Sequence, residues 1–216
     1  MDRTSDRTSA PVLVICAVAQ ELAALRVRDD VHVVAVGVGP VEAAVGTARA
    51  LAARPYRAVI NAGIGGGFRD RCEVGDSVVC AREDYVELGL EGGGTFPLPG
   101  ELTLERTVEA HMSLLQPFLD GLFPVVVGRG ITSAIVTSTD TRAMLLAQRY
   151  SADVESMEGF AVLRAAASVG LPAIEIRGIS NIVGARESNG WNFAAGARAV
   201  VETTDAFLDV ILQKSS

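Results

Sequence analysis

The sequence predicts an α/β protein with one domain, a mixed and mostly parallel sheet flanked by helices. Short apolar runs rich in β-branched residues alternate with longer segments of good helix formers. The chain has 216 residues, of which 49% are hydrophobic, enough for one sizeable core. No internal repeat or linker interrupts it. We therefore expect a single domain over residues 11–214, preceded by a flexible tail at residues 1–10.

Composition excludes several classes of function. A formal net charge of −7 argues against a nucleic-acid-binding protein and gives no support for docking on an anionic membrane. No apolar run could span a bilayer, and the polar N-terminus is unlike a secretory signal. Three cysteines without CxxC spacing and two histidines argue against a transition metal, although spacing leaves a carboxylate-bound cation open. We expect a cytoplasmic protein with no cofactor.

Three strands are predicted in the first part of the chain, each followed by a polar or glycine-rich segment. The predicted elements are a strand at 11–18, a helix at 19–26, a strand at 31–36, a helix at 41–54, and a short strand at 58–61 that ends in the glycine run 62–67. Such a dense glycine run means either tight bending or the close approach of another group.

Two features of this part are candidate site elements. Glu21 lies where a helix begins just beyond a strand, so its carboxylate either complements the helix dipole or faces a ligand over the sheet edge. Gly37-Val38-Gly39 lies between a strand and a helix, where backbone N–H groups could hold an anion or the backbone could closely approach a sugar or a water. The segment lacks the third glycine of a dinucleotide-binding motif, and no P-loop is present.

The second part of the chain continues the alternation. We predict a strand at 77–81, a loop at 85–100, a helix within 101–119 ended by Pro117 and Gly121, strands within 124–137, a helix from Thr141 capped by Ser138-Thr139-Asp140, a helix at 160–169, a strand beginning at 174, and a final helix at 193–212. Glu158 precedes a helix, and Arg177, Ser180 and Asn181 lie at or just past the end of an apolar strand.

Polar residues at the ends of separate strands are expected to converge on one crevice. Of two carboxylates there, Glu21 and Glu158, one could activate a water molecule and the other could accept hydrogen bonds from a ribose diol. Asn181 carries both a donor and an acceptor, so it could recognise a purine edge through two hydrogen bonds.

In these motifs the chain resembles the purine nucleoside phosphorylase and nucleosidase superfamily over nearly all of Val12 to Leu212. The matches to its methylthioadenosine/S-adenosylhomocysteine nucleosidases are Ala17-x-x-x-Glu21, Gly37-Val38-Gly39, Asn61-Ala62-Gly63, Val74-Gly75-Asp76, Ser156-Met157-Glu158 and Arg177-x-x-Ser180. Each motif alone is weak, but six in the same order are specific.

The resemblance implies a nucleoside phosphorylase-like fold and a site for a purine nucleoside. It implies that Glu21 activates the hydrolytic water with Arg177 nearby, that Met157 packs on the ribose, and that Glu158 binds its hydroxyls. Gly63 and Ser180, as matched motif positions, are expected to contact the substrate. Because the Gly-Asp-Pro-x-Arg phosphate motif of the phosphorylases is missing, hydrolysis is favoured over phosphorolysis.

Asn181 departs from the adenine-specific members, which carry an aspartate that protonates purine N7. An amide cannot act as a general acid, but it can donate to a 6-oxo group and accept from N7–H. The run Gly178-Ile179-Ser180-Asn181-x-Val183-Gly184-x-Arg186, followed by Trp191, resembles the futalosine hydrolase branch, as does Glu155-Ser156-Met157-Glu158-Gly159. That branch releases hypoxanthine in menaquinone biosynthesis. An adenine nucleoside stays possible because the amide can turn around, and a binding module without catalysis is a further alternative.

The resemblance also implies a homo-oligomer in which neighbouring subunits complete each other's pockets. We expect its interface near the loop 85–100 and the helix that carries His111. Three residues keep two interpretations each. Glu155 is either a solvated carboxylate or a substrate contact, and Trp191 and Phe193 either anchor the last helix or form a pocket wall.

Overall fold

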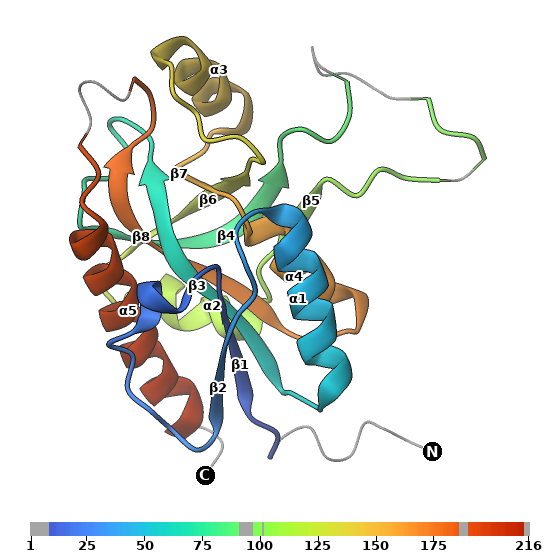
Figure 1. Cartoon of the computed structure of the whole chain (residues 1–216), viewed down its shortest axis with the longest axis vertical. Helices are drawn as coiled ribbons and strands as arrows, with labels where there is room; N and C mark the ends of the chain where they lie inside the picture. Colours follow the sequence, from blue (N-terminus) through green and yellow to red (C-terminus); the bar gives the residue numbers. More distant parts are fainter. Residues whose placement is uncertain (1–8, 91–96, 101, 186–189, 214–216) are drawn as a thin grey trace.

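The structure is a computed structural model that describes residues 9–90, 97–100, 102–185 and 190–213. In these ranges a mixed sheet lies between helices on both faces (Figure 1). The strands are β1 (Val12–Cys16), β2 (Val31–Ala35), β3 (Ala58–Gly67), β4 (Ser77–Tyr85), β5 (Thr107–Glu109), β6 (Val126–Thr132), β7 (Val154–Ser156) and β8 (Ala173–Ile182). The helices are α1 (Pro40–Ala53), α2 (Met112–Leu119), α3 (Asp140–Tyr150), α4 (Gly159–Ser168) and α5 (Phe193–Gln213), with a 3₁₀ turn η1 (Ala19–Leu22).

The sheet is mixed and mostly parallel, as predicted. Its strand order is β2-β1-β3-β7-β6-β4-β5, and β8 pairs with both β3 and β4. The pairs β3–β7, β7–β6, β6–β4, β4–β8 and β8–β3 therefore close a ring of strands. Closure removes free edges at this part of the sheet and encloses buried side chains between its strands.

Alternate residues of the central strands supply two cores, one on each face of the sheet. In β1, Val12 and Val14 pack with α5 on one face, whereas Leu13 and Ile15 pack with α4 on the other. The period of two in a strand forces this division, so continuous apolar runs mark strands covered on both faces. α5 lies along one side of the sheet, and α1 and α4 lie along the opposite side (Figure 1).

Several predicted elements are confirmed closely. The first strand, the helix after Gly39 and the final helix lie within a few residues of the predicted bounds. Thr139 caps α3 with its side-chain oxygen, and α3 begins at Asp140, one residue before the predicted start. The loop predicted at 85–100 begins one residue later, because Tyr85 ends β4, and the residues of it that are described carry no helix or strand. Most of the predicted tail and residues 91–96 lie outside the described residues.

One helix prediction is wrong, and a second is confirmed only in part. Residues 19–26 form only the single turn η1, and the Glu21 side chain accepts hydrogen bonds from the backbone N–H groups of Ala17 and Val18 just before this turn. The helix predicted within 101–119 is limited to α2, and β5 precedes it as a short partner of β4. Pro117 lies inside α2 and not beyond it.

Two strands extend further than predicted, and they do so together. β3 continues straight through the glycine run to Gly67, and β8 continues through Asn181 to Ile182, with the two paired along most of their length. Arg177 and Ser180 are consequently inside a strand instead of at its end. The sheet tolerates these side chains because the facing glycines have none.

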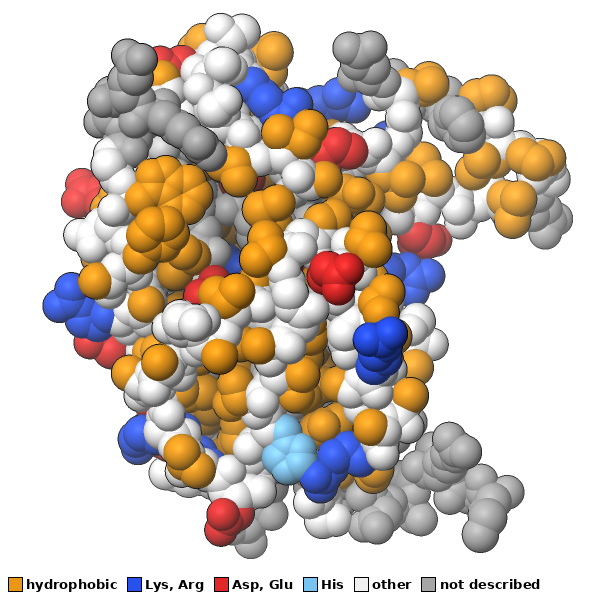
Figure 2. Space-filling view, in the orientation of Figure 1, with side chains coloured by type: hydrophobic (Ala, Val, Ile, Leu, Met, Phe, Trp, Pro, Cys, Tyr) orange, Lys and Arg blue, Asp and Glu red, His pale blue; other side chains and the backbone are white. Residues whose placement is uncertain are grey.

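Among the described residues, no helix combines the length and the apolar character that crossing a membrane requires. On the face shown in Figure 2, basic side chains stand among acidic and hydrophobic ones instead of forming one continuous surface.

Candidate active site

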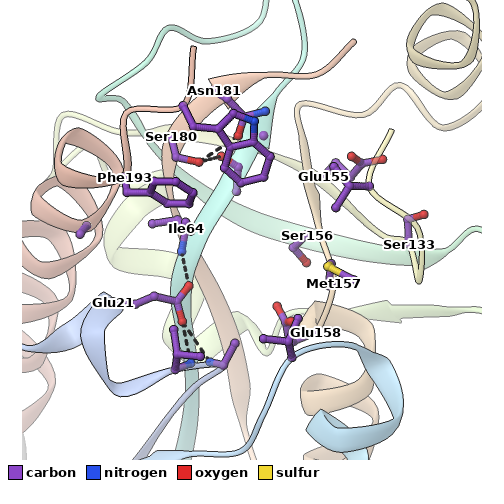
Figure 3. Close-up of a pocket in the computed structure, with 18 of the residues that line it drawn as sticks. Glu21, Ile64, Ser133, Glu155, Ser156, Met157, Glu158, Ser180, Asn181 and Phe193 are labelled. Carbon is purple, nitrogen blue, oxygen red and sulfur yellow. Dashed lines mark hydrogen bonds between the residues drawn. The ribbon is translucent and has the colours of Figure 1, made fainter. Parts of the chain in front are cut away.

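A cavity of about 470 Å³ opens over the edge of the sheet where η1, β3, β7 and β8 meet, within the size range of small-molecule sites. Its walls are mostly apolar and include Val18, Val38, Ile64, Ile135, Val136, Met157, Trp191 and Phe193. Its polar residues include Glu21, Glu155, Glu158, Ser180 and Asn181. Figure 3 shows Glu21 and Glu158 on opposite sides of one end, with Ser180 and Asn181 at the other.

Three backbone N–H groups hold the Glu21 carboxylate in place. Ala17 and Val18 donate to its Oε2 at 3.1 and 3.0 Å, and Ile64 donates to Oε1 at 3.0 Å. Hydrogen bonds from N–H groups to a carboxylate are charge-assisted and directional. They leave lone pairs of a buried but cavity-lining carboxylate available to a water molecule or a hydroxyl.

Glu158 is the residue that the Gly37-Val38-Gly39 segment holds. The Gly39 N–H donates to Glu158 Oε1 at 2.9 Å, and Arg177 Nη1 lies 3.3 Å from Oε2. Gly39 reaches this position with a φ of +93°, which favours glycine. The anion predicted for this glycine segment is therefore a carboxylate of the chain itself.

Arg177 and Gly63 lie behind the cavity and not in its lining. The Arg177 side chain is 1% exposed, and its Nε lies 2.6 Å from Glu175 Oε1. Burial lowers the pKa of Arg177, but Glu175, Glu158 and Glu21 outweigh it and raise that pKa above its ordinary value. A Cβ at Gly63 would lie 2.7 Å from Arg177 Nη1 and 2.8 Å from Glu21 Oε1, so glycine keeps space for both groups.

At the other end of the cavity, Asn181 offers an amide that is already partly bonded. Its Oδ1 lies 2.9 Å from Ser180 Oγ, and its Nδ2 donates to Ile182 O at 3.3 Å. The amide keeps one N–H and one lone pair for a ligand. Gly66, the β3 neighbour of Asn181, has no side chain to fill the space beside it.

Glu155, Trp191 and Phe193, for which the sequence left two interpretations each, all line the cavity. Trp191 and Phe193 line the cavity with ring centroids 5.0 Å apart, so they form a pocket wall. Glu155 is buried in the lining, where the Thr137 N–H donates to its Oε2 at 3.0 Å and the Thr137 hydroxyl to its Oε1. Burial raises the pKa of Glu155 above its ordinary value, although the two Thr137 hydrogen bonds lower it.

Two buried residues, Glu83 and Glu175, escaped the sequence analysis. The pattern Ile174-Glu175-Ile176-Arg177 could have indicated the second, since residues i and i+2 of a strand share a face. Opposite charges at that spacing inside an apolar strand predict a buried ion pair. Glu83 gave no comparable signal, because it stands in the charged run Arg82-Glu83-Asp84.

Comparison with known proteins places this geometry in a family. The Phosphorylase superfamily model matches residues 20–213. A futalosine hydrolase from Streptomyces coelicolor is 36% identical over 195 residues, covering 86% of this chain and 82% of that protein. A 5′-methylthioadenosine/S-adenosylhomocysteine nucleosidase from Chromohalobacter salexigens is 28% identical and covers 72% and 68%.

The fold agrees with a solved structure as well. A 5′-methylthioadenosine/S-adenosylhomocysteine nucleosidase from Colwellia psychrerythraea, in complex with adenine, superposes with a TM-score of 0.79 at 21% identity. The match covers 94% of this chain and 96% of that one. A family model matches nearly the whole chain, and the Streptomyces coelicolor relative is 36% identical to it. The chain therefore belongs to the phosphorylase superfamily.

Proposed function

We propose that this protein is a cofactor-free nucleosidase that hydrolyses the N-glycosidic bond of futalosine to hypoxanthine and dehypoxanthinyl futalosine, a step of menaquinone biosynthesis. One observation carries the proposal. A fixed carboxylate, Glu21, and an amide, Asn181, face one mostly apolar cavity from opposite ends. The Streptomyces coelicolor relative supports the same substrate.

In the proposed reaction, Glu21 accepts a proton from water as the water oxygen bonds to the ribose C1′. The C1′–N9 bond breaks, its electron pair goes to the purine, and a solvent water molecule protonates N7, so that the base leaves as neutral hypoxanthine. Glu158 accepts hydrogen bonds from the ribose hydroxyls, and Met157 packs against the sugar. The negative field of Glu21 and Glu158 stabilises the positive charge that develops on the sugar.

Asn181 is proposed to recognise the base. Its free N–H donates to the 6-oxo group, and its Oδ1 accepts from N7–H of the leaving hypoxanthine. In this orientation the Ser180 hydroxyl donates to Asn181 Oδ1 at 2.9 Å. Ser180 therefore has a positioning role in addition to lining the cavity.

The second candidate is an adenine nucleosidase acting on methylthioadenosine, adenosylhomocysteine or the 6-amino analogue of futalosine. The Ser180 hydroxyl also lies 3.2 Å from Gly65 O. If it donates there, Asn181 can turn its amide, donate to N7 and accept from a 6-amino group. The Chromohalobacter salexigens relative supports this alternative at lower identity.

A product assay separates the candidates. Purified protein is offered futalosine, its 6-amino analogue, methylthioadenosine and inosine, each with and without phosphate, and released bases are separated by chromatography. We expect hypoxanthine from futalosine at a rate independent of phosphate. Faster release of adenine from methylthioadenosine would replace the first candidate by the second, and no release from any nucleoside would favour a binding module.

We also propose a homo-oligomer in the cytoplasm. Val38, Ile135 and Phe193 line the cavity and are 55%, 63% and 55% exposed in the single chain, so a second subunit could cover this apolar rim. Free thiols at all three cysteines suit a reducing compartment. Light scattering coupled to gel filtration measures the molar mass, and a purely monomeric protein would contradict the oligomer.

A further inference from the structure

Behind the candidate site lies a buried cluster with no role in the proposed chemistry. Cys80 and Glu83 come from β4 and Glu175 from β8, where Cys80 and Glu175 are register partners. The Cys80 Sγ and one carboxyl oxygen of each glutamate lie within 4.8 Å of one another. Glu83 and Glu175 have no solvent-exposed surface. A Cβ at Gly130 would overlap Glu83, and one at Gly159 would overlap Glu175, so glycines create this space.

One oxygen of each carboxyl group has a donor and the other has none. Glu83 Oε2 accepts from Thr132 Oγ1 at 2.8 Å, and Glu175 Oε1 accepts from Arg177 Nε at 2.6 Å. Within the described part of the chain, Glu83 Oε1 and Glu175 Oε2 lack any hydrogen-bond partner. Two neighbouring carboxylate oxygens without donors are costly in a buried site. One proton between them satisfies both, because a protonated carboxyl group donates as well as accepts.

The position of Arg177 indicates which of the two carboxyl groups, Glu83 or Glu175, carries the proton. Its guanidinium is bonded directly to Glu175, which favours the anion there, whereas Glu83 has only a hydroxyl as donor. Burial, followed by the charge of Glu175, raises the pKa of Glu83 well above its ordinary value. The groups that face Glu83 are Cys80 on its own strand and Glu175 and Arg177 on β8.

We propose that Glu83 is a positioning residue, a buried neutral carboxylic acid whose O–H donates a hydrogen bond to Glu175 and thereby keeps Glu175 as the anion that fixes Arg177. From Glu175 the contacts continue to both functional carboxylates. Arg177 Nη1 lies 3.3 Å from Glu158 Oε2 and donates to Ile64 O at 3.1 Å. The N–H of the same Ile64 donates to Glu21 Oε1.

The catalytic part of this proposal rests on the proposed function, and two variants test it. Glu83→Gln keeps a neutral donor toward Glu175, so we expect kcat within about threefold of the wild type at pH 7. Glu83→Leu has a similar volume and no donor, and we expect a kcat at least tenfold lower in a folded protein. Equal kcat values for the Leu and Gln variants, or a Gln variant as impaired as Leu, would overturn the positioning role.

A second measurement tests the proton without any substrate. The folded wild type retains a proton on Glu83 that the unfolded chain releases above the ordinary glutamate pKa, so wild-type stability falls as pH rises. For each pH unit between the two pKa values, the folding constant of the wild type should fall about tenfold relative to Glu83→Gln. Denaturant unfolding at pH 5 and pH 8 measures this difference.

Parallel pH dependence in the two proteins would show that Glu83 is ionised and would overturn the proposal. A stoichiometric divalent cation found by elemental analysis of the purified protein would also overturn it, since the cation would replace the proton. If no nucleoside is hydrolysed, the proposed function fails while the unfolding comparison still decides the state of Glu83.

Discussion

The Glu21 carboxylate is fixed by three backbone N–H groups and lines the cavity, which suits a base that must hold one water in one place. Geometry of this kind is the first requirement for general base catalysis, because the base must lie within hydrogen-bond reach of the proton it takes. An amide at this position occupies the same volume but cannot accept a proton at neutral pH.

Glu21→Gln should therefore lower kcat for futalosine by about 10²–10⁴-fold, the usual contribution of a general base. Steady-state kinetics measures the loss, and circular dichroism checks the fold. Gln20→Asn is a matched control, since Gln20 also lines the cavity but is exposed. A Glu21→Gln enzyme with a near-normal rate would remove Glu21 from the proposed mechanism.

Asn181 determines base preference in the proposed function. Asn181→Asp replaces the N–H donor by an acceptor, which opposes a 6-oxo group and suits a 6-amino group. We expect the ratio of kcat/KM for futalosine to kcat/KM for its 6-amino analogue to fall at least tenfold. An unchanged ratio would mean that another residue recognises position 6 of the purine.

Among the elements, β3 contributes to the site because its glycines have no side chains. Its glycines remain extended and paired with β8 and β7, and the missing side chains leave room for Glu21, Arg177 and Asn181. An ordinary strand would fill this space with its own side chains. The glycine run 62–67 is therefore a strand that needs glycine because neighbouring side chains occupy the space beside it.

Gly63→Ala tests this role of β3. The new methyl group would displace Arg177 Nη1 and Glu21 Oε1, so we expect kcat to fall by at least tenfold. The effect on secondary structure should be smaller than the effect on kcat. Gly190→Ala is the matched control, because a Cβ there meets no atom within 4 Å. Similar activity of the two variants would show that the site tolerates the added methyl.

For the molecule as a whole, one buried cation holds several buried carboxylates together. The charges of Glu175 in β8, Glu158 just before α4 and Glu21 in η1 raise the pKa of Arg177. Removing one partner of a buried ion pair costs more than the pair contributes, because the remaining charges stay buried without compensation. The site and the core are therefore coupled through this residue.

Arg177→Met should destabilise the fold by about 3–5 kcal/mol, the typical cost of breaking a buried pair. Arg26→Met should change stability far less than Arg177→Met, since the Arg26 side chain is 58% exposed and its ion pairs with Asp205 and Asp209 lie at the surface. Denaturant unfolding of both variants measures the difference. Equal losses would contradict a central role for Arg177.

The sequence by itself determined the class of fold and several polar residues of the cavity. Alternating apolar runs and helix formers are local patterns, and they predicted the sheet, its helices and the polar positions Glu21, Glu158 and Asn181. Local patterns failed where a distant group decides the outcome. Pairing with β3 carries β8 past Arg177 to Ile182.

Only the tertiary structure decided what lies in the cavity and what lies behind it. Arg177 and Gly63 are part of the support, Trp191 and Phe193 are part of the wall, and Gly39 binds Glu158. Glu83 and Glu175 meet only because β4 and β8 pair in the closed ring. Burial and charge pairing depend on residues far apart in the chain, so a sequence pattern that extends over a few residues does not contain them.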